Sequence, residues 1–160
     1  MNKILIDSNI LLDIFLNDTK WADWSIDTLN FYEKEHLLCI NSIIYSEISI
    51  GFKKIEELET ALANSGLKLL PIPKEALFLA GKVFLTYKKV KGTKSSTLPD
   101  FFIGAHAAIE DIPLITRDLK RYQYYFPKLK IISPEEKFTL SSPIFKRHSA
   151  KKSSGFSSPL

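Results

Sequence analysis

The chain has 160 residues, of which 45% are hydrophobic and 25% are charged, which is typical of a single folded domain and excludes a disordered protein. No apolar run approaches the roughly 20 residues that cross a bilayer. Asp7 precedes any apolar signal-peptide region, and the single cysteine, Cys39, excludes an internal disulfide and a multi-cysteine metal site. We therefore expect a cytoplasmic protein.

The positive charge belongs to the C-terminal end of the chain. Residues 138–160 contain four of the 22 Lys and Arg residues and no acid. Residues 1–137 therefore contain 18 basic and 18 acidic residues and have no net charge. The net charge of +4 is therefore weak evidence for a nucleic-acid partner of the folded part. The Ser- and Lys-rich composition of residues 138–160 predicts a mobile tail.

The chain begins with an apolar run, KILID, which predicts a short buried strand ending at Asp7. Helical spacing follows in SNILLDIFLN, with Ser8 or Asn9 as the expected N-cap. Residues 21–35 then predict an amphipathic helix, and HLLCI predicts a second buried strand.

The middle of the chain continues this alternation. NSIIYSEISIGFKK predicts a helix capped by Asn41 or Ser42, and it carries Glu47. IEELETALANSG predicts a polar-faced helix that ends at Gly66. LKLLPI predicts a third strand, and KEALFLAGKVFLTYKK predicts a long helix.

The last part contains a loop, VKGTKSST, and an apolar helix, TLPDFFIGAHAA, with Asp100 in its first turn. PLIT predicts a fourth strand, RDLKRY a turn, and the region around LKII a final strand. The strands are continuous apolar runs and alternate with helices. This pattern predicts an α/β fold with three layers, a central parallel sheet of four to five strands covered by helices on both faces.

Acidic residues occur where such a sheet binds ligands, beyond the carboxyl ends of its strands. Asp7 ends the first strand, Asp118 follows the fourth, and Asp100 opens the helix leading into the fourth. Glu47 lies in an apolar stretch with no Lys or Arg three or four residues away. Each acid alone has a simpler explanation: a strand-end cap for Asp7, a turn former for Asp118, a helix-dipole partner for Asp100, and a solvent-reaching helix acid for Glu47.

If the four acids lie together, their mutual repulsion would keep several of them protonated unless a cation binds. Oxygen ligands select Mg²⁺ or Mn²⁺, and such a site suits phosphodiester cleavage. One ion lowers the pKa of a water, and a second, about 4 Å away, stabilises the leaving oxygen. The histidines His36, His106 and His148 are scattered, which disfavours a Ser-His-Asp site. We take His106 as structural.

Four stretches in order, ILIDSNILLD, SEISIG, LPDFFIGAHA and LITRDLKRYQYYFP, resemble the acidic motifs of the PIN-domain family, in particular VapC-type toxin ribonucleases of toxin–antitoxin pairs. The similarity runs from about Lys3 to Glu135 and implies a PIN-like nuclease domain over residues 1–137. Residues 138–160 depart from the compact family pattern. This tail is either passive or adds contacts to RNA.

The resemblance also implies roles for residues. The ligands of one or two Mg²⁺ or Mn²⁺ ions, and the catalytic residues, would be Asp7, Glu47, Asp100 and Asp118. The polar side chains that support them would be Ser8, Asn9 and Thr116. Candidate contacts to the substrate are Arg117, Lys89, Lys91 and Lys94. Arg117 either contacts phosphate or pairs with a carboxylate, and the lysines either hold RNA or belong to a solvated loop.

The implied activity is an endoribonuclease, often acting on transfer RNA, with no membrane partner. The implied partners are a second copy of the chain and a small antitoxin that carries a DNA-binding domain. Other interpretations stay open. A PIN-fold nuclease acting on DNA uses the same metal chemistry, and a non-catalytic RNA-binding or interaction module keeps the fold without activity. A phosphatase of the haloacid dehalogenase type is disfavoured, because Asn9 stands where such a site needs a second aspartate.

Overall fold

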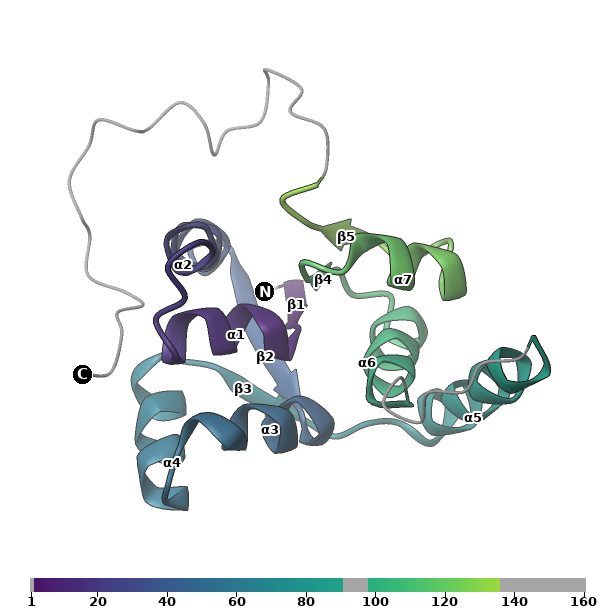
Figure 1. The fold of residues 1–160 in the computed structure, drawn as a ribbon, viewed down its shortest axis with the longest axis horizontal. Coiled ribbons are helices and arrows are strands. Elements are labelled where there is room, and N and C mark those ends of the chain that lie inside the picture. The colour runs from purple at the N-terminus through teal and green to yellow at the C-terminus, as the bar shows by residue number, and fades with distance from the viewer. Residues whose placement is uncertain (1, 91–97, 136–160) are drawn as a thin grey trace.

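The computed structural model describes residues 2–90 and 98–135 (Figure 1). A five-stranded parallel sheet lies at its centre, with the strand order β3-β2-β1-β4-β5. The strands are β1 (Asn2–Ile6), β2 (His36–Asn41), β3 (Lys68–Leu70), β4 (Leu114–Ile115) and β5 (Ile131–Ile132). The expected α/β fold with a parallel sheet is confirmed.

Helices flank the sheet, and Figure 1 shows α5, α6 and α7 grouped on the side away from α1, α2 and α4. The helices are α1 (Ser8–Phe15), α2 (Ala22–Tyr32), α3 (Ser42–Ile48), the short 3₁₀ helix η1 (Ser49–Gly51), α4 (Ile55–Asn64), α5 (Lys74–Lys89), α6 (Leu98–Ile109) and α7 (Leu119–Tyr125). Within the described ranges, no helix is both long and apolar enough to span a membrane. The expected tail, residues 138–160, lies outside the described residues, as do Lys91 and Lys94.

The order of the strands reverses at β1. From β1 the chain moves through β2 to β3 on one side, and then returns to place β4 and β5 on the other side. Ile6 of β1 pairs with Ile115 of β4, so Asp7 and Thr116 leave the same edge of the sheet side by side. Open α/β sheets bind their ligands at such a reversal. The topology therefore brings the ends of β1 and β4 to the place where a site is expected.

Two local expectations were wrong, and aspartate side chains explain both. Helix α1 is capped by Asp7 rather than by Ser8 or Asn9, because the Asp7 carboxylate accepts a hydrogen bond from Ser8 N at 2.8 Å. The stretch RDLKRY is a helix rather than only a turn. Asp118 caps α7, and Tyr122 buries its ring in the core, which stabilises this short helix. The expected cap Asn41 is confirmed at α3.

Helices α6 and α7 are joined by a close contact at Gly104. A Cβ atom added there would lie 2.3 Å from Cε2 of Phe126, the residue that ends α7. Only glycine therefore leaves room for the Phe126 ring against α6. This contact fixes the helix that carries Asp100 against the helix that follows Asp118.

We predict that Gly104→Ala lowers the free energy of unfolding by about 1 to 3 kcal/mol, because the added methyl group forces Phe126 out of its position. The matched control is Gly81→Ala in the exposed part of α5, where no atom lies within 4 Å of the added Cβ. That variant should be more stable than the wild type by about 0.5 to 1 kcal/mol. Urea unfolding followed by circular dichroism compares them, and equal stability of both variants would contradict the tight contact.

Candidate functional site

Asp7 is the most buried member of the acidic set, with 2% of its surface exposed. Its carboxylate accepts hydrogen bonds from Thr116 Oγ1 at 2.6 Å, from Asn9 Nδ2 at 3.1 Å and from the backbone of Ser8 at 2.8 Å. These donors come from the start of α1 and the end of β4, the two elements that meet where the strand order reverses. Asp7 is thus fixed in one orientation by polar contacts on both sides.

The three predicted supporting residues link Asp7 to the other acids. Ser8 donates its hydroxyl to Oε2 of Glu47 at 2.7 Å, so α3 is tied to the end of β1. Thr116 accepts from Asn9 Nδ2 at 3.2 Å and from the backbone N–H of Asp118 at 3.0 Å. The structure therefore brings Ser8, Asn9 and Thr116 around the acids. Their role in supporting a metal ion stays a prediction.

Burial and mutual repulsion act on three of the acids. Burial raises the pKa of Asp7 to about 7, against the lowering effect of Thr116, and the charges of Asp100 and Glu47 add to the rise. Burial and the charge of Asp100 likewise raise the pKa of Glu47. Burial is also the main cause that raises the pKa of Asp100, in spite of a neighbouring arginine. Carboxylates from β1, α3 and α6 are thus within electrostatic range of one another.

That arginine is Arg121, which the sequence analysis did not single out. Its Nη1 forms an ion pair with Asp100, and its Nε lies 3.3 Å from Oδ2 of Asp118. One guanidinium group therefore bridges two of the four predicted ligands. The spacing of Arg121 and Asp118, three residues apart at a helix start, is the only sequence signal that could have indicated it.

A second residue that the sequence analysis missed is Tyr122. Its side chain is 1% exposed, so its hydroxyl is shielded from solvent. Burial, followed by the charges of Asp7, Asp100 and Glu47, raises the pKa of this hydroxyl well above its ordinary value. Tyr122 is therefore a neutral hydrogen-bond donor buried beside the acids.

The donor chemistry of this set fits a hard divalent cation, since carboxylate and hydroxyl oxygens are the ligands that Mg²⁺ and Mn²⁺ select. Burial first, and then the charges of neighbouring acids, raise the pKa values of Asp7, Glu47 and Asp100, and a bound cation would offset both effects. Among the described residues, no three Asp, Glu, His or Cys side chains are close enough together to hold a metal ion. The acids converge, but they do not form a closed coordination sphere.

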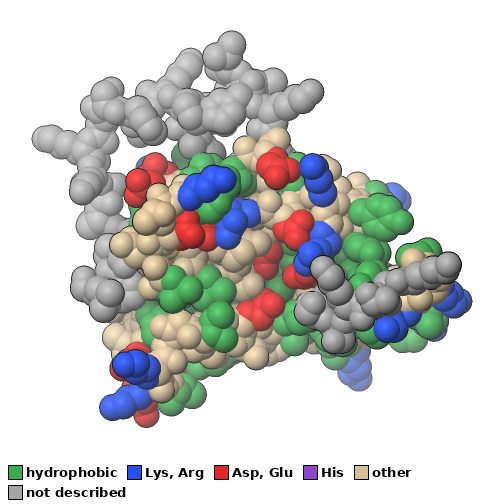
Figure 2. Space-filling view, in the orientation of Figure 1, with side chains coloured by type: hydrophobic (Ala, Val, Ile, Leu, Met, Phe, Trp, Pro, Cys, Tyr) green, Lys and Arg blue, Asp and Glu red, His purple; other side chains and the backbone are tan. Residues whose placement is uncertain are grey.

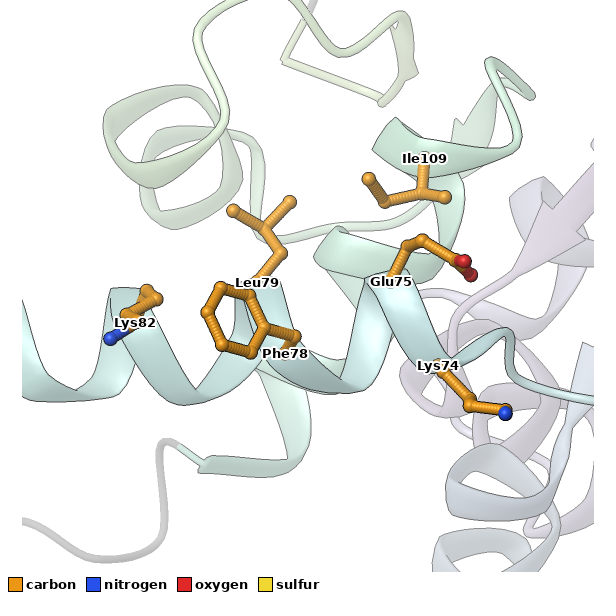
Figure 3. A pocket seen from close by; sticks show the side chains of 6 residues that line it. All are labelled: Lys74, Glu75, Phe78, Leu79, Lys82 and Ile109. Atoms are coloured by element: carbon orange, nitrogen blue, oxygen red, sulfur yellow. The ribbon is translucent and has the colours of Figure 1, made fainter.

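Figure 2 shows acidic side chains near the middle of one face of the molecule, with Lys and Arg side chains beside them. A hollow of about 530 Å³ lies elsewhere (Figure 3). It is formed by one half of α5 and the last residue of α6, Ile109, at the opposite end of that helix from Asp100. None of the four acids lines this hollow, so it is separate from the acidic site.

Three further residues that the sequence analysis discussed are His106, Arg117 and Lys89, and none of them forms a hydrogen bond or ion pair with the four acids through its side chain. His106 is 1% exposed, and its Nδ1 lies 3.1 Å from Nδ2 of Asn41, as expected of a structural histidine. Arg117 pairs with a carboxylate, but with Asp13 rather than with a member of the acidic set. Its Nε and Nη2 each lie 2.9 Å from one Asp13 oxygen, and Ser25 donates to the same carboxylate at 3.0 Å. Lys89, at the end of α5, is exposed.

This pair predicts a structural rather than a substrate-binding role for Arg117. Asp13 is 3% exposed, so Arg117→Ala would leave a buried carboxylate without its cation. Because Arg117 itself is partly exposed, we expect a loss of about 2 kcal/mol in the free energy of unfolding. Lys120→Ala, an exposed residue of α7, is the control and should change stability little. If Arg117→Ala lowers the free energy of unfolding no more than the control does, the interpretation that Arg117 contacts phosphate would be favoured.

The raised pKa of Asp7 predicts how stability depends on pH in the metal-free protein. The native state holds this proton up to about pH 7, whereas an unfolded aspartate loses it near 3.8, so unfolding becomes easier as the pH rises between these values. Asp7→Asn removes the effect. Its free energy of unfolding relative to the wild type should therefore rise by about 2 kcal/mol between pH 5 and pH 8.

Urea unfolding in the presence of EDTA measures this difference. EDTA is needed because a bound cation would stabilise the ionised carboxylate. Asp111→Asn, in the exposed turn after α6, is the matched control, and its difference from the wild type should stay constant. If the free energy of unfolding of Asp7→Asn relative to the wild type also stays constant with pH, the pKa of Asp7 is not raised in the native state.

Comparison with known structures agrees with the fold. A chain of VapBC2 from Rickettsia felis, bound to a promoter DNA fragment, matches with a TM-score of 0.62 and 21% identity over 82% of this chain and 98% of that chain. A toxin–antitoxin complex from Klebsiella pneumoniae matches with a TM-score of 0.59 and 26% identity over 82% and 97%. VapBC-1 from nontypeable Haemophilus influenzae matches with a TM-score of 0.61 and 20% identity over 82% and 97%.

A comparison of the sequence with curated proteins found no match. The sequence does match a family described as PIN domain over residues 4–127, a range that includes all four acids. This range also spans β2, β3 and β4 and includes the last three residues of β1. The chain is a member of the PIN-domain family.

Proposed function

We propose that this chain is a metal-dependent endoribonuclease and the toxin of a type II toxin–antitoxin pair of the VapC type. The observation that carries the proposal is the convergence of Asp7, Glu47 and Asp100, which come from three separate elements and share one electrostatic environment. Membership of the PIN-domain family supports nuclease activity. Similarity to a chain of the Klebsiella toxin–antitoxin complex supports the toxin assignment.

In this proposal, Asp7, Glu47, Asp100 and Asp118 hold one or two Mg²⁺ or Mn²⁺ ions. When bound, the metal supplies an activated water and stabilises the charge that develops on the phosphodiester oxygens. Hydroxyl groups of the chain orient the acids for this purpose. Thr116 donates to Asp7 at 2.6 Å and Ser8 donates to Glu47 at 2.7 Å, so that each carboxylate keeps a defined direction.

Asp7 differs from the other proposed ligands because it is almost fully buried. Its contacts to Thr116, Asn9 and the Ser8 backbone prevent it from turning toward solvent. Glu47 and Asp100 are only partly buried and lie toward the surface, where a substrate strand can approach. We infer that Asp7 anchors the cation at the base of the site and that the outer acids face the phosphodiester.

The choice of RNA as substrate rests on the likeness to VapC-type toxins, since the metal chemistry is the same for DNA. The DNA in the Rickettsia complex is a promoter fragment, which is no evidence for a DNA substrate. By the same likeness we propose a homodimer and a small antitoxin as the physiological partner. A non-catalytic module is disfavoured because all four acids are present.

The cleavage test uses purified protein with total cellular RNA in Mg²⁺, in Mn²⁺ and in EDTA. We expect discrete fragments with either metal, none with EDTA, and none from Asp7→Asn or Asp100→Asn, because each substitution removes an anionic ligand while keeping the shape of the side chain. Asp111→Asn is the control for loss of one negative charge and should cleave like the wild type. Gel electrophoresis of the RNA reads out all arms.

Single-stranded and double-stranded DNA are incubated under the same conditions. Cleavage of DNA without cleavage of RNA would favour the DNA nuclease. Cleavage that persists in EDTA would refute the metal mechanism. Full activity of Asp100→Asn would show that Asp100 is not a required metal ligand and acts only as a favourable charge at the start of α6.

A further inference from the structure

Arg121 holds a position that the proposed function reserves for a cation. Its guanidinium forms ion pairs with Asp100 of α6 and with Asp118 at the start of α7. These two acids are 18 positions apart in the sequence, and Arg121 is the group that joins them. The contact is open to solvent, because the side chain of Arg121 is 42% exposed.

The four acids are therefore divided into two pairs by the way their charge is balanced. Asp7 and Glu47 are held by neutral donors, namely Thr116, Asn9 and Ser8. Asp100 and Asp118 share a positively charged partner. Arg121 therefore occupies the space between Asp100 and Asp118, which the proposed function assigns to a cation.

We propose that Arg121 is a displaceable counter-ion, which competes with the divalent cation for Asp100 and Asp118 and, once displaced, binds a phosphate of the substrate. The inference rests on the proposed function, since it assumes that the acids bind a metal. Displacement is inexpensive, because a partly exposed arginine regains water when it leaves its ion pairs. The side chain stays attached to α7 at the rim of the acids, within reach of a bound strand.

The chemistry of arginine suits both states. Its planar group with five donors bridges two carboxylates, and the same geometry matches the oxygens of a phosphate. Among the described residues, Arg121 is the only basic side chain that forms an ion pair with one of the four acids. Arg117 is held by Asp13 and two hydrogen bonds of 2.9 Å, and Lys120 has no ion pair with a described acid within 4 Å.

Binding of Mn²⁺, measured by electron paramagnetic resonance of the free ion, tests the competition without any cleavage. The proteins are the wild type, Arg121→Gln and the matched control Lys120→Gln, which removes the same charge from the neighbouring position. We expect Arg121→Gln to bind Mn²⁺ about tenfold more tightly than the wild type, because the competing cation is gone. Lys120→Gln should stay within about twofold of the wild type, since an exposed charge has a small effect.

Cleavage of total RNA across a Mn²⁺ titration tests the second half of the proposal. Arg121→Gln should reach half of its maximal rate at a lower Mn²⁺ concentration, while its maximal rate falls, because the phosphate contact is lost. A residue with a purely structural role would not move the two quantities in opposite directions. An unchanged or higher maximal rate would overturn the phosphate contact.

The Mn²⁺ measurement also separates failure of this inference from failure of the proposed function. If the wild type binds Mn²⁺ and Arg121→Gln binds it no more tightly than Lys120→Gln does, the competition is refuted and the metal site stands. If only Arg121→Gln binds Mn²⁺, the competition is supported. If neither protein binds it, the metal site and the competition are both refuted.

Discussion

The structure depends on one electrostatic constraint, the burial of carboxylates that the sheet topology brings together. The reversal of strand order between β1 and β4 places Asp7 beside Thr116. Helix α3, which follows β2, brings Glu47 to the same edge, and Asp118 lies there at the start of α7. Asp7 has no room to move away, because Ile6 before it is paired in the sheet and its own carboxylate caps α1. Hydroxyl and amide donors offset part of the charge. Burial still raises the pKa of Asp7 to about 7, and the charges of Asp100 and Glu47 add to the rise.

A site of this kind lowers the stability of the free protein and has to be supported elsewhere. The support comes from the strands, where Leu5, Ile6, Leu114 and Ile115 have no exposed surface. It also comes from the contact of Phe126 with Gly104, which keeps α6 and α7 together although each carries an acid of the cluster. The favourable free energy of core packing thus compensates for the unfavourable arrangement of charges at the edge of the sheet.

Much of this arrangement could be predicted from the sequence, because it follows from local patterns. Continuous apolar runs predict the parallel strands, and residues that follow such strands meet at one edge. Asp7, Asp118, Ser8, Asn9 and Thr116 could be grouped in this way. The contacts that were missed join side chains whose meeting depends on tertiary packing. Arg117 meets Asp13 across 104 positions, and Arg121 meets Asp100 across 21.

Helix α7 was missed for a different reason. It has seven residues, fewer than the two turns over which helical spacing of apolar residues becomes visible. Its formation is favoured by Asp118 as N-cap and by the burial of Tyr122. The first of these is a local signal, which the sequence also offered as a turn, and only the packing of Tyr122 against the core decides between the two.

In the segment from Thr116 to Tyr122 the backbone changes from strand to helix, and this change directs neighbouring side chains to different partners. At the end of β4 the side chains alternate, so Thr116 points to Asp7 while Arg117 points the other way, to Asp13. From Asp118 onward the backbone is helical, and residues three apart share a face, so Arg121 returns to the acids. Two arginines four positions apart are thereby separated into a buried structural pair and an exposed partner of the acids. The change from strand to helix occurs at the N-cap Asp118, which therefore determines both where α7 begins and which way Arg121 points.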